Sequence, residues 1–152
     1  MTKQQYIAMA AGGSFALLAG AFVFQMLGYP PCKLCLWQRW PHAIAIAIGL
    51  IAFFRPAAIL PVLGALAAFA TGAVGLYHTG VERKWWEGPD TCTSGDIGGL
   101  STSELMDQIM AAPLIRCDEV AWQFLTLSMA SWNMIISFVL VGVWIMAIRA
   151  KT

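Results

Sequence analysis

The chain has 152 residues, of which 59% are hydrophobic and 11% are charged, and its mean hydropathy is +0.70. Because soluble domains carry about 25% charged residues, this composition excludes an ordinary soluble protein and indicates an integral membrane protein. The net charge is only +1, and no run of lysines or arginines offers a phosphate-binding surface, which excludes a nucleic-acid-binding protein.

Apolar segments between charged or Pro/Gly-rich borders predict membrane-spanning helices at residues 6–27, 38–54, 57–78 and 131–148. The first segment would be roughly 33 Å long as a helix, which matches the roughly 30 Å hydrocarbon layer. None of the segments alternates apolar and polar residues as a barrel strand does. The predicted fold is therefore all-α, a polytopic membrane four-helix bundle that forms a single membrane domain over residues 1–152.

Small residues dominate the first half of segment 6–27, which permits close contact between helices. A connecting loop, residues 28–37, follows and contains the Cys32-Lys33-Leu34-Cys35 motif. Pro41 lacks an N–H group, so it either opens the second span or kinks a helix that begins near Leu36.

The orientation of the bundle follows from its lysines and arginines. Lys3, Arg55, Arg149 and Lys151 fall on one side, whereas all eight acidic residues fall in the long loop 79–130 on the other. Because basic residues concentrate in cytoplasmic loops, we expect both termini in the cytoplasm. Loops 28–37 and 79–130 then face outward and hold all four cysteines, in a compartment where thiols tend toward disulfides.

The long loop 79–130 far exceeds ordinary connections, which indicates a functional segment. Ser101 and Glu104 form a predicted capping box, with Leu100 and Leu105 as its hydrophobic staple. A short surface helix is expected at 102–111, either lying on the bilayer or packed on top of the bundle.

The cysteines form two pairs by position, Cys32 with Cys35 and Cys92 with Cys117. Three interpretations compete: both bridges staple the outer face, four thiolates hold zinc, or the pairs exchange electrons. A strong zinc site usually needs a second Cys-x-x-Cys, which this chain lacks, so we predict no metal.

Two polar residues near Cys35 favour the redox interpretation. Arg39 would lie one helical turn from Cys35 on the same face, where its charge and the helix N-terminus stabilise a thiolate. An arginine just inside a span is costly unless paired, which favours a function over snorkelling to the surface. His78 closes the third span on the same outward side.

The chain resembles the DsbB family, the bacterial inner-membrane disulfide-bond formation proteins that reoxidise a periplasmic thiol oxidase. The resemblance covers nearly the whole chain and rests on Pro-Cys-x-Leu-Cys-x-x-Gln-Arg at 31–39, Tyr-His-Thr at 77–79, a cysteine at 92 and Cys-x-x-x-x-Trp-x-Phe-Leu at 117–125. It departs from the best-known members at Tyr77, where they carry an acid. It implies a multi-pass inner-membrane protein with cytoplasmic termini and periplasmic redox cysteines.

The resemblance also implies a chemical role for each site residue. Cys92 and Cys117 would form the disulfide that a reduced thioredoxin-fold, DsbA-like oxidase attacks at Cys92. Cys117 would then attack Cys32, which frees Cys35 to reduce ubiquinone or menaquinone. Arg39 would stabilise the Cys35 thiolate and a quinone oxygen, and His78 would hydrogen-bond a quinone carbonyl.

Two other functions compete with this interpretation. A vitamin-K-epoxide-reductase-like protein is also a four-helix quinone reductase with Cys-x-x-Cys, but in that family the redox pair follows the loop cysteines, whereas here it precedes them. A non-enzymatic membrane scaffold would use its disulfides only as staples, and the position of Arg39 would then be incidental.

Overall fold

The computed structural model describes residues 1–55, 57–89, 92, 101–111 and 115–150. In these ranges four helices are long and apolar enough to cross a membrane: α1 (Lys3–Met26), α2 (Lys33–Phe54), α3 (Ile59–Glu82) and α5 (Met129–Arg149). The predicted all-α, four-helix membrane architecture is confirmed.

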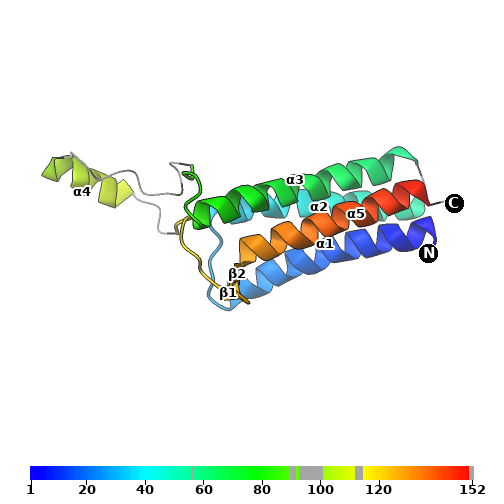
Figure 1. Cartoon of the computed structure of the whole chain (residues 1–152), viewed down its shortest axis with the longest axis horizontal. Coiled ribbons are helices and arrows are strands. Elements are labelled where there is room, and N and C mark those ends of the chain that lie inside the picture. The colour runs from blue at the N-terminus through cyan, green and yellow to red at the C-terminus, as the bar shows by residue number, and fades with distance from the viewer. Residues whose placement is uncertain (56, 90–91, 93–100, 112–114, 151–152) are drawn as a thin grey trace.

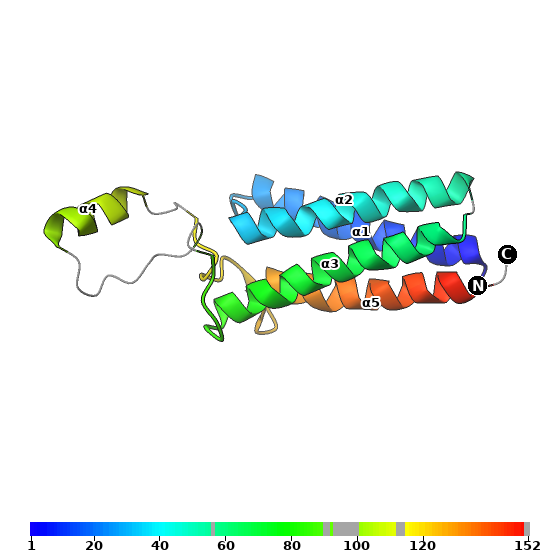
Figure 2. The same cartoon turned by 90° about the horizontal axis from the view of Figure 1, so that it is seen from above.

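The four long helices form an antiparallel bundle in which each helix packs against two neighbours, in the order α1, α2, α3, α5 around the bundle. Both termini and the α2–α3 connection lie at one end of the bundle, and the α1–α2 connection lies at the other (Figures 1 and 2). Lys3, Arg55 and Arg149 thus share one end, while Lys151 lies outside the described residues.

Small residues let the helices approach closely, as the sequence predicts. A Cβ atom at Gly49 would lie 2.3 Å from Cβ of Ala11, so α1 and α2 touch at this point. A Cβ atom at Gly64 of α3 would lie 2.6 Å from the indole of Trp144, a fully buried side chain of α5. The lipid offers no hydrophobic drive for association, so such contacts hold the bundle by close packing.

The chain leaves α1 through a Schellman turn that directs it toward the cysteine pair. Gly28 has φ +94°, and the N–H groups of Gly28 and Tyr29 donate to the carbonyls of Gln25 and Phe24. Helix α2 then begins at Lys33, five residues before the expected span, with Cys32 as its N-cap. Pro41 therefore lies inside a helix that is already under way, which decides between the two alternatives.

Helix α3 also runs further than the expected span and ends at Glu82 rather than at residue 78. Its last turn is tied to the beginning of α5, because Ser128 donates a hydrogen bond to Glu82 and the hydroxyls of Thr79 and Ser131 lie 3.2 Å apart. These additional turns of α2 and α3 carry residues of the candidate site.

A short helix and a small hairpin complete the described structure. Helix α4 (Thr102–Ala111) coincides with the predicted surface helix, and the capping box of Ser101 and Glu104 is present. The predicted staple cannot be followed, because Leu100 and the side chain of Leu105 lie outside what the structure describes. In both views α4 stands beyond the end of the bundle rather than packed on it (Figures 1 and 2).

The hairpin comprises β1 (Gln123–Phe124) and β2 (Leu127–Ser128), paired antiparallel. Its two turn residues, Leu125 and Thr126, have φ of 50° and 65°, as a two-residue type I′ turn requires. The hairpin leads directly into α5, whose N-cap is Ser128.

Candidate active site

Cys32 and Cys35 lie at the N-terminus of α2 as a pair of free thiols. The Cys32 sulfur caps the helix by accepting the backbone N–H of Cys35, and the two Sγ atoms are 2.8 Å apart. The hydrogen bond that the Cys32 thiol donates to Cys35, together with burial, raises the pKa of Cys32. The proton therefore stays on Cys32, and negative charge in this pair is favoured on Cys35.

Cys92 and Cys117 form a disulfide that packs directly on the first pair. Both residues are fully buried, and they share an apolar cluster with Cys32, Leu34 and Val81, against which Cys35 also packs. The Cys117 backbone N–H donates to the Cys92 carbonyl across the bridge at 2.8 Å. The structure thus brings all four predicted cysteines together at one end of the bundle.

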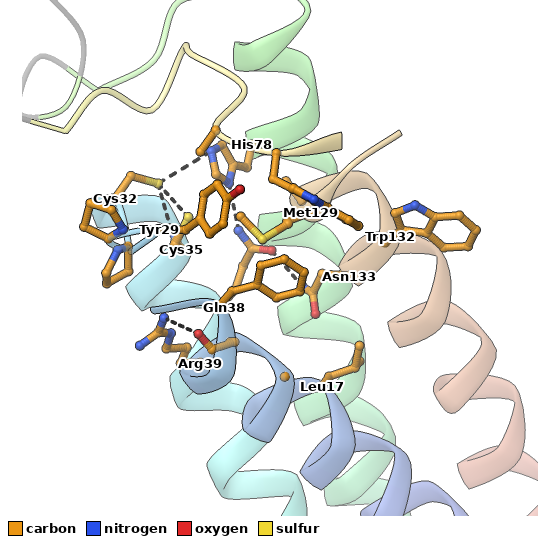
Figure 3. A pocket seen from close by; sticks show the side chains of 18 of the residues that line it. Leu17, Tyr29, Cys32, Cys35, Gln38, Arg39, His78, Met129, Trp132 and Asn133 are labelled. Atoms are coloured by element: carbon orange, nitrogen blue, oxygen red, sulfur yellow. Dashed lines mark hydrogen bonds between the residues drawn. The ribbon is translucent and has the colours of Figure 1, made fainter. Parts of the chain in front are cut away.

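His78 lies beside Cys32 (Figure 3) and also contacts Cys117 of the loop disulfide. Its Nε2 is 3.6 Å from Sγ of Cys32 and 3.2 Å from the carbonyl oxygen of Cys117. On the other side of the ring, Nδ1 is 3.0 Å from the Gln38 side-chain nitrogen. A carboxylate is also near, since Glu82 Oε1 lies 3.8 Å from His78 Nε2.

A buried polar network joins His78 to the interior of the bundle. Gln38 Oε1 accepts a hydrogen bond from Asn133 Nδ2 of α5 at 2.7 Å, and Asn133 Oδ1 is 2.8 Å from His42 Nε2. The Thr71 hydroxyl accepts from Asn133 and donates to the Gln38 carbonyl, in the turn that precedes Pro41. We did not predict Gln38, His42, Thr71, Glu82 or Asn133 as site residues from the sequence.

Arg39 lies one turn deeper than Cys35, but its hydrogen bonds go to α1. Its Nη1 donates to Gln25 Oε1 at 2.7 Å and its Nη2 donates to the Ala21 carbonyl at 3.3 Å. The guanidinium also lies 4.9 Å from the centre of the Phe22 ring. Among the described residues Arg39 makes no hydrogen bond to Cys35, although both line the same cavity.

A cavity of about 440 Å³ lies next to the cysteine pair and is walled by α1, the first turns of α2, the beginning of α5 and residues 115–124. Its lining is mostly apolar and includes Phe24, Trp122 and Trp132. Its polar lining includes Cys35, Arg39, His42 and His78. The volume is within the range of small-molecule and cofactor sites.

The segment next to Cys117 is held by an ion-pair cluster. Arg116 donates two hydrogen bonds to the Asp118 carboxylate, at 2.9 and 2.7 Å, and Lys84 forms a salt bridge with the same group. These contacts hold the pKa of Asp118 well below its usual range. The cluster therefore keeps its charge throughout the physiological pH range and anchors the loop at the end of α3.

The geometry also bears on the metal alternative. The donor atoms of Cys32, Cys35 and His78 lie within 4.8 Å of one another, a group that could hold a cation. A metal-bound histidine normally donates its other ring N–H to an acceptor, but His78 Nδ1 faces a Gln38 nitrogen that also donates to the Leu34 carbonyl. This partner does not suit a ligating histidine and favours a redox site.

The chain is similar to proteins of one family over nearly its whole length. The family model described as Disulfide bond formation protein DsbB matches residues 3–147. The Disulfide bond formation protein B of Shewanella sp. (strain MR-4) is 32% identical over 134 residues, covering 84% of this chain and 75% of that protein. That of Verminephrobacter eiseniae is 28% identical over 158 positions, covering 99% and 88%.

A further relative is the Uncharacterized protein RP370 of Rickettsia prowazekii, 25% identical over 132 residues, covering 84% of this chain and 77% of that protein. No solved structure matches the chain.

Proposed function

Because the chain belongs to the DsbB family of disulfide bond formation proteins, and is thus a multi-pass membrane oxidoreductase, we propose that it reoxidises a DsbA-like thiol oxidase in the periplasm and passes the electrons to a membrane quinone. The observation that carries the proposal is the burial of both cysteine pairs in one cluster beside an apolar cavity that Cys35 lines. If the disulfides only stapled the outer face together, neither the Cys32–Cys35 pair of free thiols nor the cavity would be needed.

A quinone, either ubiquinone or menaquinone, fits the residues of this cavity. The walls are apolar, as a prenylated ring requires, and the buried Arg39 Nε has no hydrogen-bond partner among the described residues. An unmet buried donor is costly, so a ligand oxygen accepting from it would stabilise the complex. When bound, the quinone would supply an acceptor for two electrons and two protons.

The first exchanges take place at the cysteines. A thiolate of the reduced partner attacks Cys92, which breaks the Cys92–Cys117 bond and leaves Cys117 as a thiolate. Cys117 then attacks Cys32 in an oxidised Cys32–Cys35 pair, which forms a Cys32–Cys117 disulfide and releases Cys35 as a thiolate. The shared cluster of Cys32 and Cys117 supports this step, because the two residues belong to the same packed group.

The loop disulfide is restored by two further exchanges. The partner's second thiol attacks the partner sulfur bonded to Cys92, which releases oxidised partner and the Cys92 thiolate. Cys92 attacks Cys117 and releases Cys32. Two electrons and two protons then reside on Cys32 and Cys35.

His78 and the helix N-terminus assist the exchange in this proposal. The Cys32 thiolate released in the last exchange would accept the Nε2–H of His78, which lies 3.6 Å away, until it takes up the proton of the pair. The N-terminal dipole of α2 favours negative charge on Cys35. A hydrogen bond from His78 to a quinone carbonyl remains a prediction. It would require His78 Nε2 to break its contact with the Cys117 carbonyl oxygen.

Access to Cys92 needs a local movement, since this residue is 1% exposed. We infer that docking of the partner exposes Cys92 before the first attack. The proposal also places the cysteine end of the bundle in the periplasm and the end with Lys3, Arg55 and Arg149 in the cytoplasm, following the distribution of basic residues.

The proposal is tested with purified protein, a reduced periplasmic thioredoxin-fold oxidase and a short-chain quinone, with quinone absorbance as the readout. The wild type should turn over, and Cys35→Ser should lose turnover because the donor sulfur is gone, while the serine keeps the size of the side chain. Absence of turnover in the wild type would favour the scaffold alternative, and full turnover in Cys35→Ser would contradict the proposed relay.

A further inference from the structure

The orientation of the Gln38 side chain can be fixed from one backbone carbonyl. Gln38 Nε2 lies 3.2 Å from the Leu34 carbonyl, a group that can only accept a hydrogen bond. The same nitrogen lies 3.0 Å from His78 Nδ1, which must therefore be the acceptor. The Gln38 oxygen then points the other way, toward α5.

The orientation of Gln38 fixes the orientation of Asn133 and the position of the proton on His42. Gln38 Oε1 can only accept, so its partner 2.7 Å away is the Asn133 side-chain nitrogen. The Asn133 oxygen consequently faces His42 Nε2 at 2.8 Å, and His42 must carry its proton on Nε2. In a neutral imidazole the other nitrogen, Nδ1, then has a free lone pair and can only accept.

No group in the described part of the protein donates a hydrogen bond to the lone pair of His42 Nδ1. The residue is 3% exposed and lines the cavity, and its Nδ1 is buried with no hydrogen-bond partner in the described part of the chain. Arg39 Nε is in the same condition and lies three residues earlier, on the same face of α2. The other described buried atoms without partners belong to Ser14, Ser137 and Trp144, which do not line the cavity.

Two residues of the cavity wall thus carry one unmet donor and one unmet acceptor. A quinone carbonyl only accepts hydrogen bonds, so it can meet Arg39 but not His42. A hydroxyl group both donates and accepts, so the reduced quinone can meet both residues. Leaving a buried polar group without a partner costs more free energy than a typical hydrogen bond contributes. The site should therefore discriminate between the oxidised and reduced forms of the quinone.

We propose that His42 is a second ligand-binding residue of the cavity, which accepts a hydrogen bond from a hydroxyl of the reduced quinone and makes the site bind the reduced form more tightly than the oxidised form. The inference deepens the proposed function and rests on it, because it assumes that a quinone occupies the cavity. Gln38 and Asn133 act as positioning residues that hold the His42 proton on Nε2.

The first test reads the histidine directly. The chain has only two histidines, so a ¹⁵N-histidine NMR spectrum of the Cys32→Ser/Cys35→Ser protein, which cannot turn over, contains two imidazoles, and His42→Gln in that background identifies the His42 signals. We expect the proton on Nε2 of His42, and a shift of its Nδ1 signal when reduced short-chain ubiquinone is added but not when the oxidised form is added. A proton on Nδ1, or the same response to both forms, would overturn the inference.

The second test measures affinity in the same background, through quenching of the tryptophan fluorescence, to which Trp122 and Trp132 at the cavity contribute. His42→Phe should weaken binding of the reduced form about fivefold and leave the oxidised form within about twofold. His42→Gln should retain the preference, because its amide offers both a donor for Asn133 and an acceptor for the ligand. Equal weakening of both forms by His42→Phe would reduce His42 to a structural residue. Failure of both forms to bind a correctly folded unsubstituted protein would instead contradict the proposed function.

Discussion

Arg39 lies one helical turn from Cys35, where the sequence places it, but its guanidinium is anchored on α1. The bonds to Gln25 and to the Ala21 carbonyl use its two terminal nitrogens and leave Nε without a partner among the described residues. The arginine thus acts as a bridge that fixes α1 against α2 at the cavity wall. Its action on Cys35 in our account is through the shared cavity and the charge, not through a direct hydrogen bond.

Replacement of Arg39 by methionine should therefore affect the quinone more than the thiols. We expect Arg39→Met to raise the KM for quinone at least about tenfold, because a charged hydrogen-bond donor is lost from a buried site. Lys33→Met is the control, because it also replaces a positively charged side chain of α2 with methionine but lies outside the cavity lining. Equal kinetics of Arg39→Met and the wild type would mean that the arginine only snorkels to the membrane surface.

The site residues divide by how local their signal is. The Cys-x-x-Cys motif and Arg39 could be proposed as site residues from the sequence, because they lie within one stretch of chain at the beginning of one helix. Gln38 and Asn133 are 95 positions apart, and their hydrogen bond depends on how α2 and α5 cross, which no local pattern encodes. His42 had no assigned role for the same reason, since its meaning comes from a partner on another helix.

At the scale of the elements, the apolar segments predicted the long helices. The observed boundaries differ from the predicted ones where polar residues at the helix ends make hydrogen bonds. Helix α2 starts early because Cys32 caps it, and α3 continues to Glu82, whose carboxylate is held by Ser128 of the neighbouring segment. The capping box predicted α4 correctly because that motif is entirely local. A local cap at α2 and a contact with a neighbouring segment at α3, rather than hydropathy, thus decided these two helix ends.

The contact of α3 with α5 should depend on the absence of a side chain at Gly64. Gly64→Ala would place a methyl group 2.6 Å from the Trp144 ring, and we expect it to destabilise the bundle by about 1–3 kcal/mol. Gly142→Ala is the matched control, because nothing lies within 4 Å of its Cβ position. Unfolding in detergent measures both variants, and equal midpoints for the two would contradict the proposed close packing.

At the scale of the whole molecule, the two ends of the bundle carry different groups of residues. One end gathers the termini and the basic residues Lys3, Arg55 and Arg149, and the other gathers both cysteine pairs, His78 and the cavity. The loop disulfide covers the first pair on the outside, while the cavity adjoins it on the side of the helices. In the proposed function, the Cys32–Cys35 pair would thus lie between a soluble thiol partner and a membrane ligand.

The central claim is that electrons leave through Cys32 and Cys35, with the loop pair one exchange further away. The most direct test starts from fully reduced protein without partner, adds one equivalent of quinone under anaerobic conditions, and maps disulfides by rapid alkylation and mass spectrometry. Our account predicts that the Cys32–Cys35 disulfide appears first, and that Cys35→Ser forms no Cys92–Cys117 disulfide at all. Formation of Cys92–Cys117 in Cys35→Ser, or its appearance before Cys32–Cys35 in the wild type, would contradict the account.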